Sequence, residues 1–194
     1  MEEQIIISLG SNLGDRLNAL YKALALLEAY PISIKLLSKV YETPAWGFKG
    51  DPFYNACVSI KTKLKPKDLL EVLLKVEKTM GKLPSKGKGY SSRTIDLDLL
   101  FYKSKNIFSA KLKVPHPKLH KRNFVLAPLC EIAPKFIHPI LFQTIEELFQ
   151  KSSDQTIATP LNYDLGLPPI FESFPYIVIE GNIGVGKTTL AKLL

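Results

Sequence analysis

The chain has 194 residues, of which 46% are hydrophobic and 23% charged, and its formal net charge is +8. Its mean hydropathy of +0.06 is typical of a globular protein, and no apolar run reaches the roughly eighteen residues that a membrane span needs. The N-terminal residues lack the basic and apolar segments of a signal peptide. We therefore expect a cytoplasmic protein that has no membrane partner.

The first hundred residues alternate short apolar runs with amphipathic stretches. The expected elements, in chain order, are a strand at 4–9, a helix at 15–31, a strand at 34–41, a loop at 43–52, a strand at 54–62, a helix at 66–81, a loop at 81–92 and a strand at 94–102. The order β-α-β-β-α-β predicts an α+β, ferredoxin-like core.

The rest of the chain is expected to contain two more helices, followed by a linker. Helices are predicted at 124–132 and 144–150, which gives a first domain at 1–151 with extra C-terminal helices. Residues 152–175 are rich in Pro, Ser, Thr and Asp without clear periodicity, so we predict a linker there. We expect residues beyond Ser152 either to be poorly ordered or to pack on the first domain or a neighbour.

The terminal residues contain a phosphate-binding motif. Residues 181–188, GNIGVGKT, match G-x-x-x-x-G-K-[ST] after an apolar stretch at 176–179, and Lys187 would reach the phosphates. Only seven residues follow Lys187 (194 − 187), too few for the remaining strands and the acidic motif of a P-loop domain. We interpret 176–194, which resembles the start of a deoxynucleoside kinase, as a truncated stub without catalytic activity of its own.

Two carboxylates, Asp96 and Asp98, form the strongest candidate for chemistry. Side chains at i and i+2 of a strand share one face, which places their Cα atoms about 6.6 Å apart. Ile95, Leu97 and Leu99 would then point into the core. A carboxylate pair is costly in a core but suits Mg²⁺, which takes carboxylate, phosphate and water oxygens. The alternative is a solvated face of an antiparallel sheet.

Basic residues downstream favour the metal interpretation. His116 stands between two prolines, and His120, Lys121 and Arg122 follow shortly before Phe124. Cations opposite a carboxylate pair are what a metal–triphosphate site requires. The alternatives are a loop histidine stiffened by its prolines and an ordinary core phenylalanine.

Five motifs occur in order along residues 4–150: GSNLGDR, YETPAWG, FYNACV, SRTIDLDLL and VPHPKLHKRNFVLAPL. Together they resemble the 6-hydroxymethyl-7,8-dihydropterin pyrophosphokinases of folate biosynthesis. The resemblance implies that pyrophosphate passes from ATP to the hydroxymethyl group of the reduced pterin, releasing AMP. Small-molecule substrates, a monomer and no nucleic-acid partner are expected.

The resemblance also implies roles for particular residues. Asp96 and Asp98 would bind two Mg²⁺ ions, with Arg93, Asp96, Asp98 and Arg122 catalytic. The residues implied to hold ATP are Glu77, Lys82, Arg93, His116 and Arg122. The residues implied to form the pterin pocket are Thr43, Pro44, Ala45, Phe53, Asn55 and Phe124. Two aromatic rings suit a flat heterocycle, and an amide suits its polar edge.

The loop at 81–92 departs from the family pattern. It carries Lys82, Lys86, Lys88 and Tyr90 where the family usually has arginines and a tryptophan, and lysine lacks the fork that grips phosphate in a bidentate manner. We predict that this loop is a lid over ATP, with an inert solvated loop as the alternative, and that Trp46 is a second moving element.

Two other functions remain open at this point. A nucleoside kinase fragment would release ADP and depend on Lys187. A basic RNA-binding domain would show salt-sensitive affinity and need neither Asp96 nor Asp98. The two cysteines, Cys57 and Cys130, are predicted to be buried thiols in a reducing compartment.

Overall fold

The computed structural model describes residues 4–81, 91–163 and 165–166. Its strands are β1 (Ile5–Ser11), β2 (Ile32–Leu37), β3 (Val40–Thr43), β4 (Phe53–Thr62), β5 (Asp96–Tyr102), β6 (Ile107–Phe108), β7 (Lys113–Val114) and β8 (Thr159–Leu161). Its helices are α1 (Arg16–Glu28), α2 (Pro66–Thr79), α3 (Asn123–Ile132) and α4 (Ile145–Gln150), with a 3-10 turn at Leu119–Lys121. Lys82, Lys86, Lys88, Tyr90, Lys187 and most of the predicted lid lie outside the described residues.

The main sheet is antiparallel and has the order β5-β1-β4-β3-β8, with β2 also paired to β4. This order confirms the ferredoxin-like α+β prediction. The strand predicted at 34–41 is divided into β2 and β3, because Ser38 interrupts it. The buried Ser38 donates its N–H to the Cys57 carbonyl (3.0 Å), and its hydroxyl accepts from the Cys57 N–H (2.9 Å).

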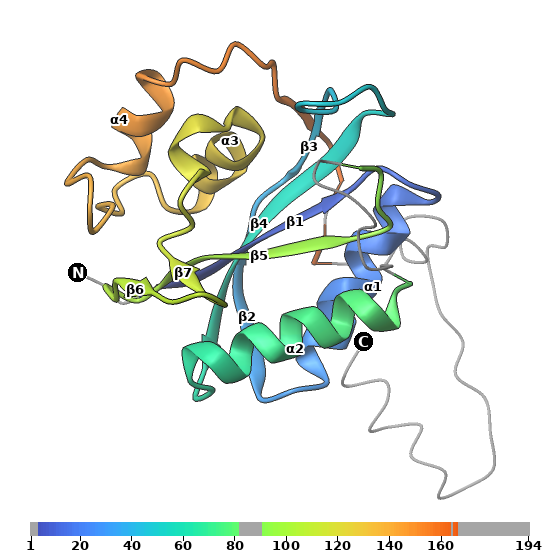
Figure 1. Ribbon diagram of the computed structural model, residues 1–194. Coiled ribbons are helices and arrows are strands. Elements are labelled where there is room, and N and C mark those ends of the chain that lie inside the picture. The colour runs from blue at the N-terminus through green and yellow to red at the C-terminus, as the bar shows by residue number, and fades with distance from the viewer. Residues whose placement is uncertain (1–3, 82–90, 164, 167–194) are drawn as a thin grey trace, which may run out of the picture.

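Helices α1 and α2 cover one face of the sheet (Figure 1). Asp15 caps α1 by accepting from the Asn18 N–H at 3.1 Å, and Pro66 opens α2 at a position where its missing N–H costs nothing. The strands contribute alternate residues to the core below these helices: Ile5, Ile7, Leu9, Ala56, Val58, Ile60, Leu97 and Leu99. The predicted inward direction of Leu97 and Leu99 is confirmed.

Helices α3 and α4 cover the opposite face (Figure 1). The intervening residues of the same strands meet them in a second core, which includes Ile6, Cys57, Leu100, Phe101, Leu126 and Leu129. Toward the other end of this face the register continues with small or polar residues, namely Ser8, Gly10, Asn55, Asp96 and Asp98. The change from apolar to polar along one face marks where a site can form.

The segment predicted as a linker belongs to the sheet over part of its length. Strand β8 pairs with β3, and Leu165 is buried in the first core. Residues 159–161 are therefore part of the sheet, because the outer edge of β3 offers backbone groups that β8 satisfies. Among the residues described, none belongs to a helix long and apolar enough to cross a membrane.

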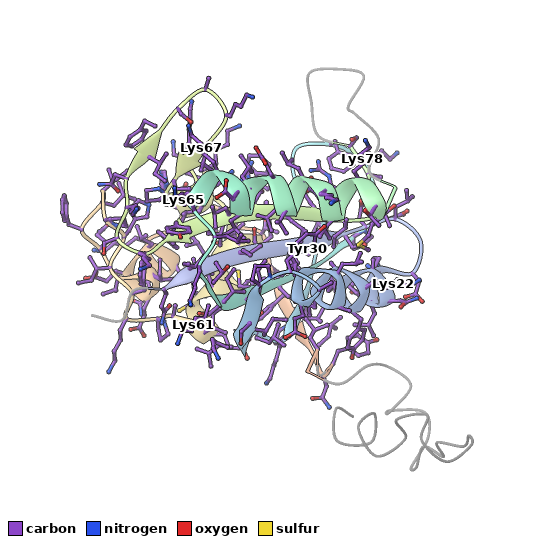
Figure 2. All side chains as sticks on the ribbon, turned by 90° about the horizontal axis from the view of Figure 1, so that it is seen from below. Lys22, Tyr30, Lys61, Lys65, Lys67 and Lys78 are labelled. Atoms are coloured by element: carbon purple, nitrogen blue, oxygen red, sulfur yellow. The ribbon has the colours of Figure 1, made fainter. Side chains whose placement is uncertain are left out.

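Part of the positive charge lies over the outer surface of α1 and α2 (Figure 2). The lysines labelled there are exposed: Lys22, Lys61, Lys65, Lys67 and Lys78. Cys57 is buried as predicted, whereas Cys130 is only half-buried, and both are free thiols.

Candidate active site

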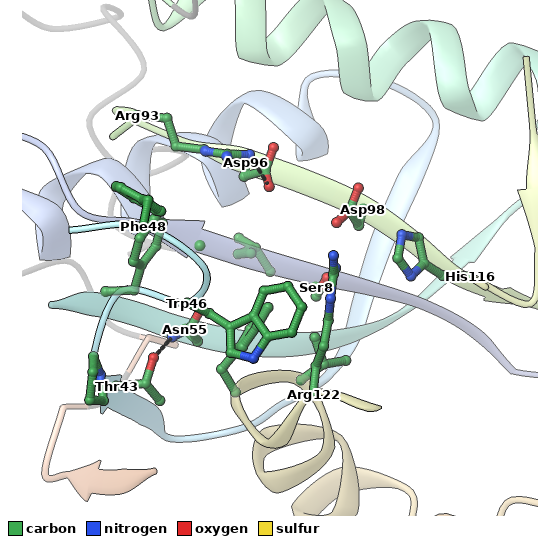
Figure 3. A pocket seen from close by; sticks show the side chains of 16 residues that line it. Ser8, Thr43, Trp46, Phe48, Asn55, Arg93, Asp96, Asp98, His116 and Arg122 are labelled. Atoms are coloured by element: carbon green, nitrogen blue, oxygen red, sulfur yellow. Dashed lines mark hydrogen bonds and ion pairs between the residues drawn. The ribbon is translucent and has the colours of Figure 1, made fainter. Parts of the chain in front are cut away.

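A cavity of about 270 Å³ opens at the polar end of the α3 face (Figure 3). The register of three strands builds its floor, because Gly10 lies opposite both Asn55 and Asp96, and Ser8 lies opposite Asp98. A Cβ at Gly10 would come within 3.2 Å of the Asn55 side-chain oxygen. The glycine therefore keeps room for the amide of Asn55.

The charged half of the cavity is formed by β5 and the segments after it. Asp96 and Asp98 project from the strand into the cavity, facing His116 and Arg122 (Figure 3). Arg93 forms an ion pair with Asp96 (Nη1 to Oδ2, 2.7 Å). Burial lowers the pKa of His116 and outweighs the opposing attraction of Asp98, while Arg122 lowers it further. His116 is therefore neutral at neutral pH and offers a ring N–H donor.

Asn12 joins the charged half to the loop at 44–52. Its side-chain oxygen accepts from the Arg93 N–H (2.8 Å), and its amide nitrogen donates to the Asp51 carbonyl and the Ser92 hydroxyl (3.1 Å each). The side chain is buried, so these bonds form in a region where unpaired polar atoms are costly. The asparagine of the GSN motif therefore links three segments of the chain: the end of β1, the residues just before β5 and the loop at 44–52.

The second half of the cavity is aromatic and carries one amide. Asn55 donates from Nδ2 to the Thr43 hydroxyl at 2.8 Å, and both residues are buried. Two ring pairs line the walls, Phe48 with Phe53 (6.2 Å between centroids) and Trp46 with Phe124 (6.3 Å). The Arg122 guanidinium lies 5.2 Å from the Trp46 ring and 5.4 Å from the Phe124 ring, at the boundary between the halves.

The carboxylate pair fits a hydrated divalent cation. Asp96 and Asp98 both line the cavity, which leaves space beside them for further oxygen ligands. Within the described part of the chain, no group of three or more His, Cys, Asp or Glu side chains could hold a metal. The other ligands would then be phosphate oxygens and water, as Mg²⁺ commonly has in phosphoryl-transfer sites.

Most of the predicted site residues lie together around this cavity. Those that line it are Thr43, Pro44, Phe53, Asn55, Arg93, Asp96, Asp98, His116, Arg122 and Phe124. Ala45 is half-buried and does not line it. Glu77 is buried below β5, where its Oε1 accepts from the Leu97 N–H (2.7 Å), so its implied contact with adenosine stays a prediction.

Sequence reasoning missed several residues that line the cavity: Ser8, Gly10, Phe48 and Val125. Ser8 and Gly10 could have been found, because they occupy alternate positions of the first strand and share a face. Phe48 lies in a loop without periodicity and carries no such signal. Trp46, predicted as a moving element, forms part of the aromatic wall.

Fold and site together define an α+β protein with a carboxylate pair and basic side chains beside an aromatic pocket. Residues 6–134 match the 7,8-dihydro-6-hydroxymethylpterin-pyrophosphokinase (HPPK) family, and the chain belongs to this family of ATP-dependent pyrophosphokinases.

Relatives and structures agree with this assignment. The chain is 42% identical to 2-amino-4-hydroxy-6-hydroxymethyldihydropteridine pyrophosphokinase of Aquifex aeolicus over 144 residues, 74% of this chain and 88% of that protein. It is 38% identical to the folic acid synthesis protein fol1 of Pneumocystis carinii over 162 residues, 83% of this chain but 22% of that protein. Wild-type Plasmodium falciparum HPPK-DHPS shares the fold (TM-score 0.59, 17% identity, 77% of this chain, 44% of that chain).

Proposed function

We propose that the chain transfers pyrophosphate from ATP to the hydroxymethyl oxygen of 6-hydroxymethyl-7,8-dihydropterin and releases AMP, a step of folate biosynthesis. The observation that carries the proposal is one cavity with two unlike halves. A carboxylate pair with basic side chains suits a metal–triphosphate, and an amide among aromatic rings suits a pterin. The substrates are small molecules, and we propose a cytoplasmic monomer.

In the charged half, Asp96 and Asp98 would hold two Mg²⁺ ions, which would neutralise phosphate charge and align the attacking hydroxyl. The Arg93 guanidinium pairs with the Asp96 carboxylate, and when ATP binds it would also donate N–H groups to phosphate oxygens. Neutral His116 donates its ring N–H to a phosphate oxygen, and the Arg122 guanidinium stabilises the charge that develops during transfer. We assign no general base, since catalysis here rests on positioning and electrostatics.

In the aromatic half, the Thr43 bond fixes the direction of the Asn55 amide. Because Nδ2 donates to Thr43, the oxygen of Asn55 lies toward Gly10 and the cavity, as an acceptor for a pterin N–H. Phe53 and Phe124 supply faces for the ring, and Trp46 closes the side near Arg122. The substrate hydroxymethyl group would then point to Asp96 and Asp98.

The test is a nucleotide product assay on the whole chain. ATP, Mg²⁺ and the reduced pterin are incubated with the protein, and AMP is separated from ADP. The proposal requires AMP that appears only with pterin. ADP as the product would instead favour the phosphate-binding motif at 181–188, and a Lys187→Ala variant run in parallel decides between the two sources.

A further inference from the structure

Residues 152–163, which we name the C-terminal clasp, lie beyond the family match that ends at residue 134. The clasp leaves α4, passes the start of α3 and reaches the outer edge of β3 (Figure 1). Both places belong to the walls of the aromatic half of the cavity. The clasp is therefore in a position to influence pterin binding without entering the cavity.

The first contact of the clasp is made by Asp154 on the first residue of α3. Its Oδ2 accepts from the Asn123 N–H at 2.8 Å, and the Asn123 side chain donates to the main-chain carbonyls of Asp154 and Thr156. The other carboxylate oxygen accepts from the Thr156 N–H (2.9 Å) and hydroxyl (2.6 Å). Thr156 thus fixes the carboxylate, and the carboxylate fixes Asn123.

Helix α3 depends on this contact because it has no cap of its own. The N-cap residue Arg122 makes no side-chain cap bond, and the first turn contains no acidic residue. A carboxylate is favourable at this end, where N–H groups and the helix dipole are both positive. The pKa of Asp154 agrees: partial burial raises it, but hydrogen bonds from Thr156 and Asn123 outweigh burial and lower it.

The residues on either side of Asn123 are Arg122 and Phe124, and both line the cavity. Holding the main chain of Asn123 therefore restricts where their side chains can lie. Farther along, β8 pairs with β3 up to Glu42, one residue before Thr43. The clasp thus contacts the chain next to both walls of the aromatic half.

We infer that Asp154 is a positioning residue for pterin binding: it caps α3 and so holds Phe124 and Arg122 opposite the Thr43–Asn55 wall. This inference rests on the proposed function and adds to it a residue that the family match does not include. Loss of one cap is expected to weaken pterin binding about fivefold, the factor that corresponds to about 1 kcal/mol. Because Arg122 lies at the boundary between the halves, a smaller change of about twofold is expected in the KM for ATP.

The experiment measures pterin affinity of the whole chain through the fluorescence of Trp46, its single tryptophan, together with kcat and both KM values. Asp154→Ala is expected to raise the pterin Kd and KM about fivefold. Asp154→Asn keeps an acceptor oxygen and is expected to recover part of the loss. The matched control is Thr144→Ala, which removes the cap of α4, a helix that contributes no residue to the cavity lining.

Two results would overturn the inference: pterin affinity unchanged in folded Asp154→Ala, or an equal loss in Thr144→Ala, which would indicate general destabilisation. If Asp154→Ala does not fold, Thr156→Val decides, because it keeps the carboxylate but removes one bond that orients it. About twofold weaker binding supports the inference, and unchanged binding in both Thr156→Val and Asp154→Asn rejects it. A wild-type chain without pterin-dependent AMP rejects the proposed function itself, which separates the two failures.

Discussion

The two halves of the cavity differ in how far the protein alone arranges them. In the aromatic half, Asn55 and Thr43 are buried and bonded to each other, and the rings contact one another. In the charged half, Arg93 is paired with Asp96, a carboxylate that the proposed metal ions would also need. The aromatic half is therefore preorganised, whereas the charged half would rearrange when nucleotide and metal bind.

This difference predicts which kinetic parameter each half controls. Interactions present before the reaction contribute to binding, and those strongest in the transition state contribute to kcat. Substitutions in the charged half should lower kcat, and those in the aromatic half should raise the pterin Kd. A residue that changes both parameters would lie at the boundary.

The largest effect is expected for Asp98→Ala, which removes half of the carboxylate pair. We expect kcat to fall by about a thousandfold or more, because one lost electrostatic contact in a catalytic site costs a factor of about 10²–10³ and metal binding is weakened as well. Pterin Kd should change less than threefold. The measurement is AMP release over a Mg²⁺ titration.

The control for this variant is Asp68→Ala, which removes an exposed carboxylate from the first turn of α2. Its kcat should match the wild type. If Asp98→Ala kept more than a tenth of the wild-type kcat, the carboxylate pair would not be the metal site.

A smaller effect is expected for Arg122→Lys. The guanidinium is planar and lies near both the Trp46 and Phe124 rings, and lysine preserves its charge but not its fork or its stacking. We expect kcat to fall about a hundredfold and pterin Kd to rise about threefold, which would place Arg122 at the boundary. Steady-state kinetics in which ATP and pterin are varied in turn separates the effect on kcat from the effect on pterin binding. An effect on kcat alone would assign Arg122 to the charged half.

The sequence predicted the parts of the site that follow from strand periodicity. The alternation in 94–102 placed Asp96 and Asp98 on one face and Leu97 and Leu99 in the core, which are 4% exposed each. The same spacing argument, applied to α2, puts Glu77 four residues after the buried Leu73, on the inner face. The spacing agrees with the observed burial of Glu77, whereas its contact with a nucleotide, which the resemblance to a known family implies, stays a prediction.

Contacts that depend on tertiary structure could not be predicted. The bond from Asn123 to Asp154 joins residues 31 positions apart, in a segment with no periodic pattern. Strand β8 exists because β3 has an unpaired edge, not because Thr159–Leu161 has strong strand propensity, since its centre is Pro160. Phe48 enters the cavity through the course of a loop that has neither helical nor strand periodicity.

Asn55→Ala tests the aromatic half of the cavity. Its effect is expected to be smaller than those of Asp98→Ala and Arg122→Lys. Loss of a buried amide that bonds Thr43 and, as we propose, the pterin should raise pterin Kd about tenfold to a hundredfold, since each buried bond contributes roughly 1–3 kcal/mol when one partner is removed. Titration of Trp46 fluorescence gives the Kd, and kcat at saturating pterin should stay within about threefold. A large loss of kcat at saturation would mean that this half also acts in the transition state.

The smallest effect on activity is expected for His138→Gln, a buried polar residue outside the cavity. The ring nitrogen Nδ1 of His138 accepts from the N–H groups of Ile140 and Leu141 (3.2 Å each), and burial, together with the charge of nearby His120, lowers its pKa from 6.5 to about 4. Because the folded pKa lies below the unfolded one, this contribution to stability is complete above about pH 6.5 and is lost as pH falls toward 4. Denaturant unfolding should show that the free energy of unfolding of the wild type is lower at pH 5.5 than at pH 7.5 by on the order of 1 kcal/mol. The full loss is not reached at pH 5.5, because this pH lies between the folded and the unfolded pKa of His138. In His138→Gln the loss of stability between pH 7.5 and 5.5 should be smaller, and kcat/KM at pH 7.5 should stay within about twofold of the wild type. A large loss of kcat/KM at pH 7.5 would show that the cavity depends on the segment around His138.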